Sequence, residues 1–199
     1  MNAAAPRAVL FDLGGVLLPF DRERRVGAIV SQLGVDADDV RELFDGPLPR
    51  RLDLGEADEA DFAAAFAAMS DRPITPATAR ALILSAFEAP NTELWRIAAA
   101  LRHKLIVGGF SDNPTFVAEV FPDAALLDPM IFSSQIAAIK PSDAAFAAAE
   151  ARLGFGGDAV LFIDDARGNV AAARRRGWDA ICFRPTAQTA AELERRGLL

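Results

Sequence analysis

The sequence predicts an α/β protein in which a Rossmann-like parallel sheet core carries an inserted helical cap. Short, nearly continuous apolar segments bounded by glycine or charged residues are typical of strands buried on both faces of a parallel sheet. After residue 90 such segments alternate with helical patterns, and this alternation indicates right-handed βαβ units. We expect strands at about residues 7–12, 104–111, 130–134, 159–164 and 179–183.

The chain between the first two expected strands has helical periodicity and none of the alternation typical of strands. We therefore expect a core domain of residues 1–18 and 90–199, interrupted by a helical cap domain of residues 19–89. Gly34 is expected to end the first cap helix, because glycine readily adopts the left-handed conformation found there. The expected cap helices cover about residues 21–34, 36–46, 56–70 and 75–87, and the expected core helices cover about 91–102, 114–121, 142–154 and 168–177.

Charge and composition disfavour several classes of function. The formal net charge is −7, whereas nonspecific nucleic-acid binding depends on Lys and Arg neutralising phosphates. No apolar stretch approaches the roughly 20 residues of a membrane span, and the start of the chain lacks signal-peptide features, so we expect a cytoplasmic protein. One cysteine and one histidine rule out an internal disulfide and a Cys/His metal cluster. We expect Cys182 to be buried and His103 to be exposed.

Residues suited to phosphoryl chemistry stand at the ends of the expected strands. Asp12 closes the first strand, Ser111 closes the second, Lys140 follows the third, and Asp164 and Asp165 close the fourth. The carboxyl ends of parallel strands form the ligand-binding edge of an open sheet. A nucleophilic carboxylate, two further acids, a hydroxyl and an ammonium are therefore expected at one Mg²⁺-assisted phosphoryl-transfer site.

These segments resemble a known family. FDLGGVL, the serine that ends the second strand, SSQIAAIKP and FIDDARGNVAAARRRG resemble the four motifs of the haloacid dehalogenase (HAD) superfamily, in the same order along the whole chain. The helical insert is similar to the first cap type of that family. The first motif looks most like that of bacterial sugar-phosphate phosphatases with a DLG-type sequence. The resemblance implies a HAD-type hydrolase.

The resemblance implies catalytic and substrate-binding roles for the residues at the motif positions. Asp12 would be the nucleophile that forms an aspartyl-phosphate, and Lys140 would neutralise the nucleophile and the transferring phosphoryl group. Ser111 would hydrogen-bond a phosphate oxygen, and it could also cap a following helix. Asp112 and Asn113 would complete the phosphate-binding loop.

The resemblance also implies a metal site. Mg²⁺ takes hard oxygen ligands, commonly one or two carboxylates with waters and substrate phosphate. The expected ligands are Asp12, Asp164, Asp165 and the backbone carbonyl of Gly14, with Asn169 in a supporting polar position.

Two positions depart from the family pattern. Gly14 stands where family phosphatases usually have a second Asp that acts as general acid and base. Losing a positioned acid/base typically costs about 10²–10⁴ in rate, so either the leaving group is a good one or the proton comes from elsewhere. Asp112 stands where the family often has Asn, and a carboxylate there would repel phosphate unless it points away.

The leading hypothesis is a Mg²⁺-dependent phosphatase that acts on a small phosphorylated metabolite, such as a sugar phosphate, as a monomer or homodimer. The alternatives are a 2-haloacid dehalogenase, in which Asp12 would attack carbon without a metal, and a catalytically impaired HAD-fold binding protein. The paired acids Asp164 and Asp165 argue against the first alternative, while Gly14 and Asp112 motivate the second.

The start of the expected cap carries residues that bear on substrate choice. Phe20 and Asp21 stand there beside Arg22, Arg24 and Arg25. One of the three arginines could contact an anionic or hydroxyl-rich substrate, with a solvated helix face as the alternative. The sequence does not identify which of these side chains faces the site.

Overall fold

The computed structural model describes residues 5–121 and 123–199 and contains a five-stranded parallel sheet. The strand order is β3-β2-β1-β4-β5, and every neighbouring pair is parallel. This confirms the predicted Rossmann-like α/β class. The strands are β1 (Ala8–Phe11), β2 (Ile106–Ser111), β3 (Met130–Phe132), β4 (Val160–Asp164) and β5 (Asp179–Cys182).

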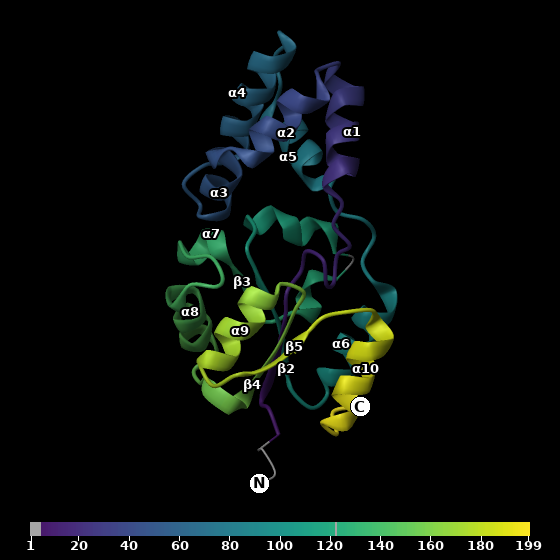
Figure 1. The fold of residues 1–199 in the computed structure, drawn as a ribbon, viewed down its shortest axis with the longest axis vertical. Coiled ribbons are helices and arrows are strands. Elements are labelled where there is room, and N and C mark those ends of the chain that lie inside the picture. The colour runs from purple at the N-terminus through teal and green to yellow at the C-terminus, as the bar shows by residue number, and fades with distance from the viewer. Residues whose placement is uncertain (1–4, 122) are drawn as a thin grey trace.

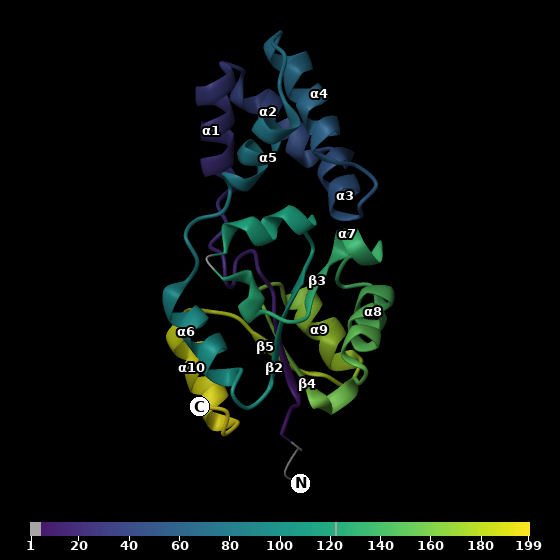
Figure 2. The same ribbon diagram turned by 180° about the vertical axis from the view of Figure 1, so that it is seen from behind.

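Two layers of helices cover the sheet, as Figures 1 and 2 show from opposite sides. Val9 of β1 belongs to a core cluster that includes side chains of α6 (Thr92–Leu101) and α10 (Thr186–Arg195), whereas Leu10 packs with α8 (Asp143–Leu153) and α9 (Arg167–Arg175). All four residues of β1 are buried. Because successive side chains of a strand point to opposite faces, the apolar run of β1 is explained by burial on both sides.

Helices occupy the chain between β1 and α6. Five helices lie there, with no strand among residues 22–84: α1 (Arg22–Leu33), α2 (Ala37–Asp45), α3 (Pro47–Asp53), α4 (Glu59–Ser70) and α5 (Pro76–Leu84). Local signals define their ends: Asp21 caps α1, Gly34 ends it with φ 71°, and Asp58 forms a capping box with Asp61. Figures 1 and 2 both show these helices beyond one end of the sheet, with α3 beside α7 (Ser133–Ile136).

Contacts between α3 and α7 join the helical segment to the end of β3. The hydroxyl of Ser133 donates a hydrogen bond of 2.5 Å to the carbonyl oxygen of Asp53. A Cβ on Gly55 would lie 2.5 Å from the carbonyl oxygen of Ser134, so the backbones are in close contact. The last turn of α3 is thereby held over the carboxyl edge of the sheet.

The structure differs from the sequence-based expectations in several places. The segment expected as a helix at 114–121 forms a 3-10 helix, Thr115–Val120, whose start has no capping side chain. It follows that Ser111 does not cap a helix. Pro47 begins α3, a short helix outside the expected cap helices, because proline suits the first helical position. Helices α7 and α10 were also not expected, and Cys182 is half-buried, since it ends the edge strand β5. His103 is exposed, as expected.

Two shorter 3-10 helices, Ala124–Leu126 and Gly157–Ala159, complete the described chain. None of the helices in the described ranges is long and apolar enough to cross a membrane.

Candidate active site

The carboxyl edge of the sheet brings Lys140 between two carboxylates. Its Nζ lies 3.0 Å from Oδ1 of Asp12 and 3.0 Å from Oδ2 of Asp164, and it donates a hydrogen bond of 2.8 Å to the carbonyl oxygen of Phe110. The Lys140 side chain is only 1% exposed and that of Asp164 is fully buried. Two of the three ammonium protons are donated to Phe110 and Asp164, and the Asp12 carboxylate pairs with the same charge. Lys140 is therefore a fixed positive charge at the end of β1 and β4.

Burial and charge shift the pKa values of this pair in ways that matter for chemistry. Burial raises the pKa of Asp12 to about 7, although the Lys140 ammonium acts in the opposite direction. Burial would lower the pKa of Lys140, but the carboxylates of Asp12, Asp164 and Asp112 outweigh it and raise that pKa. Lys140 is therefore charged at neutral pH, and it favours the ionised, nucleophilic form of Asp12.

Three acids at this edge form a cluster that could hold a metal ion. Carboxylate oxygens of Asp12, Asp164 and Asp165 lie within 4.8 Å of one another. Hard oxygen donors at this spacing fit Mg²⁺ better than a metal that prefers sulfur or imidazole. Burial, and then the charge of Asp164, raise the pKa of Asp165.

The two acids at the end of β4 differ in their surroundings. Both oxygens of Asp164 accept hydrogen bonds: Oδ1 from the backbone N–H of Ala166 and the amide of Asn169, and Oδ2 from Lys140 and the same amide. Asp165 is exposed. Asp164 is thus held as a partner of Lys140, whereas the exposed Asp165 carboxylate pairs with no other side chain among the described residues. Asn169 occupies the supporting position that the sequence indicated.

The glycines after Asp12 allow Asp165 to approach. Gly15 has a φ of +78°, and a Cβ there would lie 2.5 Å from Oδ2 of Asp165. A Cβ on Gly14 would meet only the ring of Phe87, at 3.6 Å, which is an ordinary contact. The close approach of the chain to the acidic cluster therefore requires glycine at position 15 more strictly than at position 14.

The loop after β2 places Asp112 and Asn113 beside the site. Oδ1 of Asp112 accepts a hydrogen bond of 3.0 Å from the backbone N–H of Lys140, so this carboxylate anchors the Lys140 loop. The amide of Asn113 donates to Oγ of Ser111 at 2.9 Å. Ser111 is fully buried, and among the residues that line the adjoining cavity are Asp112 and Asn113 but not Ser111. The structure thus brings Ser111, Asp112 and Asn113 together. Ser111 lies behind the other two and does not line the cavity.

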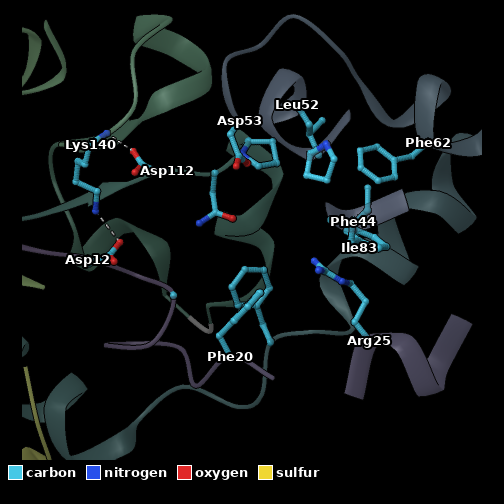
Figure 3. Close-up of a pocket in the computed structure, with 15 residues that line it drawn as sticks. Asp12, Phe20, Arg25, Phe44, Leu52, Asp53, Phe62, Ile83, Asp112 and Lys140 are labelled. Atoms are coloured by element: carbon cyan, nitrogen blue, oxygen red, sulfur yellow. Dashed lines mark hydrogen bonds and ion pairs between the residues drawn. The ribbon is translucent and has the colours of Figure 1, made fainter. Parts of the chain in front are cut away.

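A cavity of about 300 Å³ extends from this edge of the sheet into the helical segment (Figure 3). Asp12, Gly14 and Lys140 line its inner end. In Figure 3, Arg25 lies across the cavity from Asp12 and Lys140, and Asp53 lies close to Asp112. Sequence reasoning left Arg25 undecided among three neighbouring arginines.

Asp53 was not foreseen, because it lies at the end of α3, a helix that the pattern did not predict. Its surroundings are unusual for a carboxyl group. Burial and then the charge of Asp112 raise the pKa of Asp53 to about 7, and Arg25 and Arg50 act in the opposite direction. Burial, the largest effect, also raises the pKa of Asp112, against Lys140. Perturbed acids in a cavity are candidates for a functional site.

Solved structures of known proteins share this fold. A HAD family enzyme of Bacteroides thetaiotaomicron, crystallised with magnesium and inorganic phosphate, matches with a TM-score of 0.79 at 22% identity over 90% of this chain and 94% of that chain. A predicted HAD-like family hydrolase of Porphyromonas gingivalis matches with a TM-score of 0.81 at 24% identity, over 96% and 99%. The chain therefore has the HAD fold that its motifs indicated.

A weaker likeness extends to a different chemistry. The L-2-haloacid dehalogenase of Xanthobacter autotrophicus with covalently bound chloropropionic acid matches with a TM-score of 0.62 at 17% identity, over 98% of this chain and 84% of that chain. No protein-family model and no curated protein matches the sequence. Because all of these identities are low, they establish the fold and leave the reaction to be argued from the site.

Proposed function

From the HAD fold and the geometry of its carboxyl edge, we propose that this protein is a Mg²⁺-dependent phosphatase that hydrolyses a small phosphorylated metabolite. The observation that carries the proposal is the fixed Lys140 ammonium, 3.0 Å from the Asp12 carboxylate and beside a cluster of three acids. A nucleophilic carboxylate, a buried cation and oxygen ligands for a divalent metal are the parts that phosphoryl transfer through an aspartyl-phosphate needs.

In the first step, a carboxylate oxygen of Asp12 forms a bond to phosphorus as the bond from phosphorus to the ester oxygen breaks. The ester oxygen departs with the electron pair and takes a proton from water. In the second step, a water oxygen attacks the phosphorus of the aspartyl-phosphate as the bond from phosphorus to the Asp12 oxygen breaks, and Asp12 departs as a carboxylate. The attacking water loses one proton, which neutralises the hydroxide left by the first step, and inorganic phosphate is released. Lys140 stabilises negative charge at the inner end of the cavity throughout, because its three oxygen partners hold it in place.

The proposed ligands of Mg²⁺ are the carboxylates of Asp12 and Asp165, with the backbone carbonyl of Gly14 and waters. Bound there, the ion would neutralise charge on the transferring phosphoryl group. Asp164 belongs to the same cluster, and we assign it to orienting Lys140, since both of its oxygens already accept hydrogen bonds. For the phosphate we propose the Asn113 side chain and the loop anchored by Asp112, with Ser111 supporting Asn113 from behind.

The helical segment is proposed to act as the cap of this site, inserted at residues 19–89 between the two parts of a core domain at 1–18 and 90–199. Side chains of α1 to α5 form the outer wall of the cavity, while the core supplies Asp12 and Lys140. A cap of this kind would exclude water and contact the organic part of the substrate.

Dehalogenase activity is the second candidate, because the haloacid dehalogenase shares the fold and because Gly14 removes a residue that phosphatases usually have. The exposed carboxylate of Asp165 beside Asp12 disfavours it. A haloacid enzyme that uses no metal gains nothing from a third acid 4.8 Å or less from its nucleophile.

A single set of assays separates the two candidates. Phosphate release from a panel of aryl, acyl and sugar phosphates is measured with Mg²⁺ and with EDTA, and halide release from 2-chloropropionate is measured in parallel. We expect Mg²⁺-dependent phosphate release that is abolished in Asp12→Asn. Halide release without phosphate release would replace the proposal with the dehalogenase. If neither phosphate nor halide were released, the protein would be a binding protein.

A further inference from the structure

The outer part of the cavity is mostly apolar. The inner end holds Asp12 and Lys140. The outer wall belongs to the helical segment and to the chain just before and after it, at Phe20 and Phe87 (Figure 3). Its apolar side chains include Phe20, Phe44, Leu52, Phe62, Ile83 and Phe87. Phe20 and Phe87 also pack on each other, with ring centroids 5.4 Å apart. Such walls favour a flat apolar group over one covered with hydroxyls.

The polar side chains of the cavity offer little to a sugar. One oxygen of Asp112 accepts a hydrogen bond from the backbone of Lys140, and the Asn113 amide, which donates to Ser111, is the group proposed above for the phosphate. Apart from the inner pair of Asp12 and Lys140, the charged side chains left to face a ligand are Asp53 and Arg25. A hydroxyl buried without a hydrogen-bond partner costs about 1–3 kcal/mol, so several hydroxyls against these aromatic walls would bind poorly.

Arg25 is the one basic side chain on the outer wall. Its guanidinium lies 3.6 Å from the centroid of the Phe44 ring, which fixes the plane of the group, and its Nε is buried without a hydrogen-bond partner in the described structure. No carboxylate of the described residues lies within 4.0 Å of it, although Arg22 pairs with Asp45. Burial lowers the pKa of Arg25 to about 10, so it is still charged at neutral pH.

A largely desolvated cation that pairs with no carboxylate is costly, and the charge of Asp53, more than 4.0 Å away, offsets only part of that cost. A ligand carboxylate at the guanidinium would supply the rest. The neighbouring helix positions show that this is specific to Arg25. Arg24, one residue earlier, is half exposed, with Glu88 at 3.9 Å, and it does not line the cavity. A guanidinium is a planar fork of donors that matches a carboxylate. Asp53 and Asp112 lie on another side of the cavity, toward α3 and the loop after β2.

Building on the proposed phosphatase activity, we propose that the substrate is a phosphorylated molecule whose organic part is aromatic, or similarly flat and apolar. This organic part carries a carboxylate that binds to Arg25. The phosphoryl group lies at Asp12 and Lys140, the apolar ring lies against the apolar side chains of the cavity, and the carboxylate lies at the outer wall. A phenol or a carboxylic acid is also a good leaving group, which suits a site with Gly14 in place of an acid.

The test uses substrate pairs that differ in charge but hardly in shape. Carboxyphenyl phosphates and the corresponding carbamoylphenyl phosphates, as 3- and 4-isomers, are compared by kcat/KM at pH 7.5 with Mg²⁺. A hydrogen-bonded charge pair predicts a preference of about 10–100-fold for the carboxylate in at least one isomer pair. The preference should disappear in Arg25→Gln and persist in Arg24→Gln, the exposed neighbour.

Three results would overturn the inference while leaving the phosphatase intact: equal hydrolysis within both isomer pairs, a carboxylate preference that survives in Arg25→Gln, or a higher kcat/KM for glucose 1-phosphate than for any aryl phosphate. If no phosphate ester is hydrolysed, calorimetry with the 3- and 4-isomers of hydroxybenzoate and hydroxybenzamide decides instead. Tighter binding of a hydroxybenzoate that depends on Arg25 would support the carboxylate site without the reaction. Equal binding of both compounds would reject it.

Discussion

Nζ of Lys140 lies 3.0 Å from Oδ1 of Asp12, although strands β2 and β3 and helices α1 to α7 lie between the two residues along the chain. The pair exists because Asp12 follows β1 and the Lys140 loop is anchored by Asp112, which follows β2, the neighbouring strand. Both side chains are largely buried, at 1% and 13% exposure. A charge pair at this depth acts strongly on a ligand and is costly to break.

We expect Lys140→Met to abolish most activity and to destabilise the protein. The variant keeps the apolar stem but leaves the buried Asp12 and Asp164 without their cation. Phosphatase activity should fall by at least about 10²-fold, and the free energy of unfolding should fall by about 3–5 kcal/mol. The measurements are kcat/KM and urea unfolding without Mg²⁺. Lys104→Met is the control, since Lys104 is exposed before the start of β2, the strand end opposite the site, and its Nζ donates to the carbonyl oxygen of Leu198. Wild-type turnover in Lys140→Met would remove Lys140 from the mechanism.

Asp165→Asn should weaken Mg²⁺ binding by at least about tenfold. The proposed site relies on this carboxylate, since Asp164 is already occupied by Lys140 and Asn169. Calorimetric titration with Mg²⁺ measures the effect directly and needs no substrate. Asp158→Asn, an exposed acid just before β4, should bind Mg²⁺ like the wild type. If Asp165→Asn also retained wild-type affinity, the metal would have to be placed elsewhere.

Alanine at the two adjacent glycines should give unequal effects. In Gly15→Ala the new Cβ would lie 2.5 Å from Oδ2 of Asp165, and the residue would keep an unfavourable φ of +78°. We therefore expect weaker Mg²⁺ binding and a loss of stability of about 1 kcal/mol or more. In Gly14→Ala the new Cβ meets only Phe87, at 3.6 Å, so stability should change by less than about 0.5 kcal/mol. Thermal unfolding with and without Mg²⁺ compares the two. Equal behaviour would mean that Asp165 moves freely.

The sheet and its site edge could be predicted from the sequence for a physical reason. Apolar runs such as AVLF and VLFID have few alternatives to burial on both faces, and parallel strands place their ends together. The motif residues Asp12, Lys140 and Asp164 therefore meet as expected. The sequence could not predict that Asp164 pairs with Lys140 while Asp165 is exposed. These residues are adjacent in one motif, but their side chains point into different surroundings.

The side of the cavity formed by α1 to α5 could not be predicted from the sequence for another reason. Asp53 and Arg25 lie on helices whose orientation depends on packing between segments, which periodicity does not specify. Arg22, Arg24 and Arg25 are chemically alike, and only the packing against Phe44 distinguishes the third. A short helix such as α3 leaves too weak a pattern to be predicted, so Asp53 had no signal at all.

Asp53 should make the protein less stable as the pH rises. Its folded-state pKa, about 7, exceeds the ordinary value of 3.8 because of burial and the nearby Asp112, which Arg25 and Arg50 only partly offset. The folded state thus holds a proton that the unfolded state has already lost between pH 4 and 7. Stability is lost across that interval, by up to about 4 kcal/mol for a shift of this size. Asp53→Asn cannot ionise, so it should be more stable than the wild type at pH 8.

Urea unfolding of Asp53→Asn and the wild type at pH 4.5, 6 and 8 measures the difference. The stability advantage of the variant should grow with pH and level off above about pH 7. Glu56→Gln, at a nearby exposed position, controls for the general loss of a negative charge. An advantage of Asp53→Asn that is the same at all three pH values would show that Asp53 titrates normally.

The absence of an acid at Gly14 should make hydrolysis unusually sensitive to the leaving group. An aryl or acyl phosphate needs little proton donation as its bond to phosphorus breaks, whereas a simple alkyl phosphate leaves as a basic alkoxide. Without a positioned donor the alkyl ester should be slower by up to about 10²–10⁴-fold. Gly14→Asp tests the cause, and the surroundings accept a side chain, since the nearest atom to a new Cβ is 3.6 Å away.

We expect Gly14→Asp to raise kcat/KM for alkyl phosphates much more than for aryl phosphates, and so to flatten the dependence of rate on leaving-group acidity. Gly14→Asn is the matched control, because it has the same shape but no proton to donate, and it should leave the dependence steep. A series of alkyl and aryl phosphates with Mg²⁺ provides the measurement. If the wild type already hydrolyses both classes equally, a group other than residue 14 donates the proton. Asp53, a carboxyl group that titrates near neutral pH in the same cavity, would then be the first to replace, by Asn.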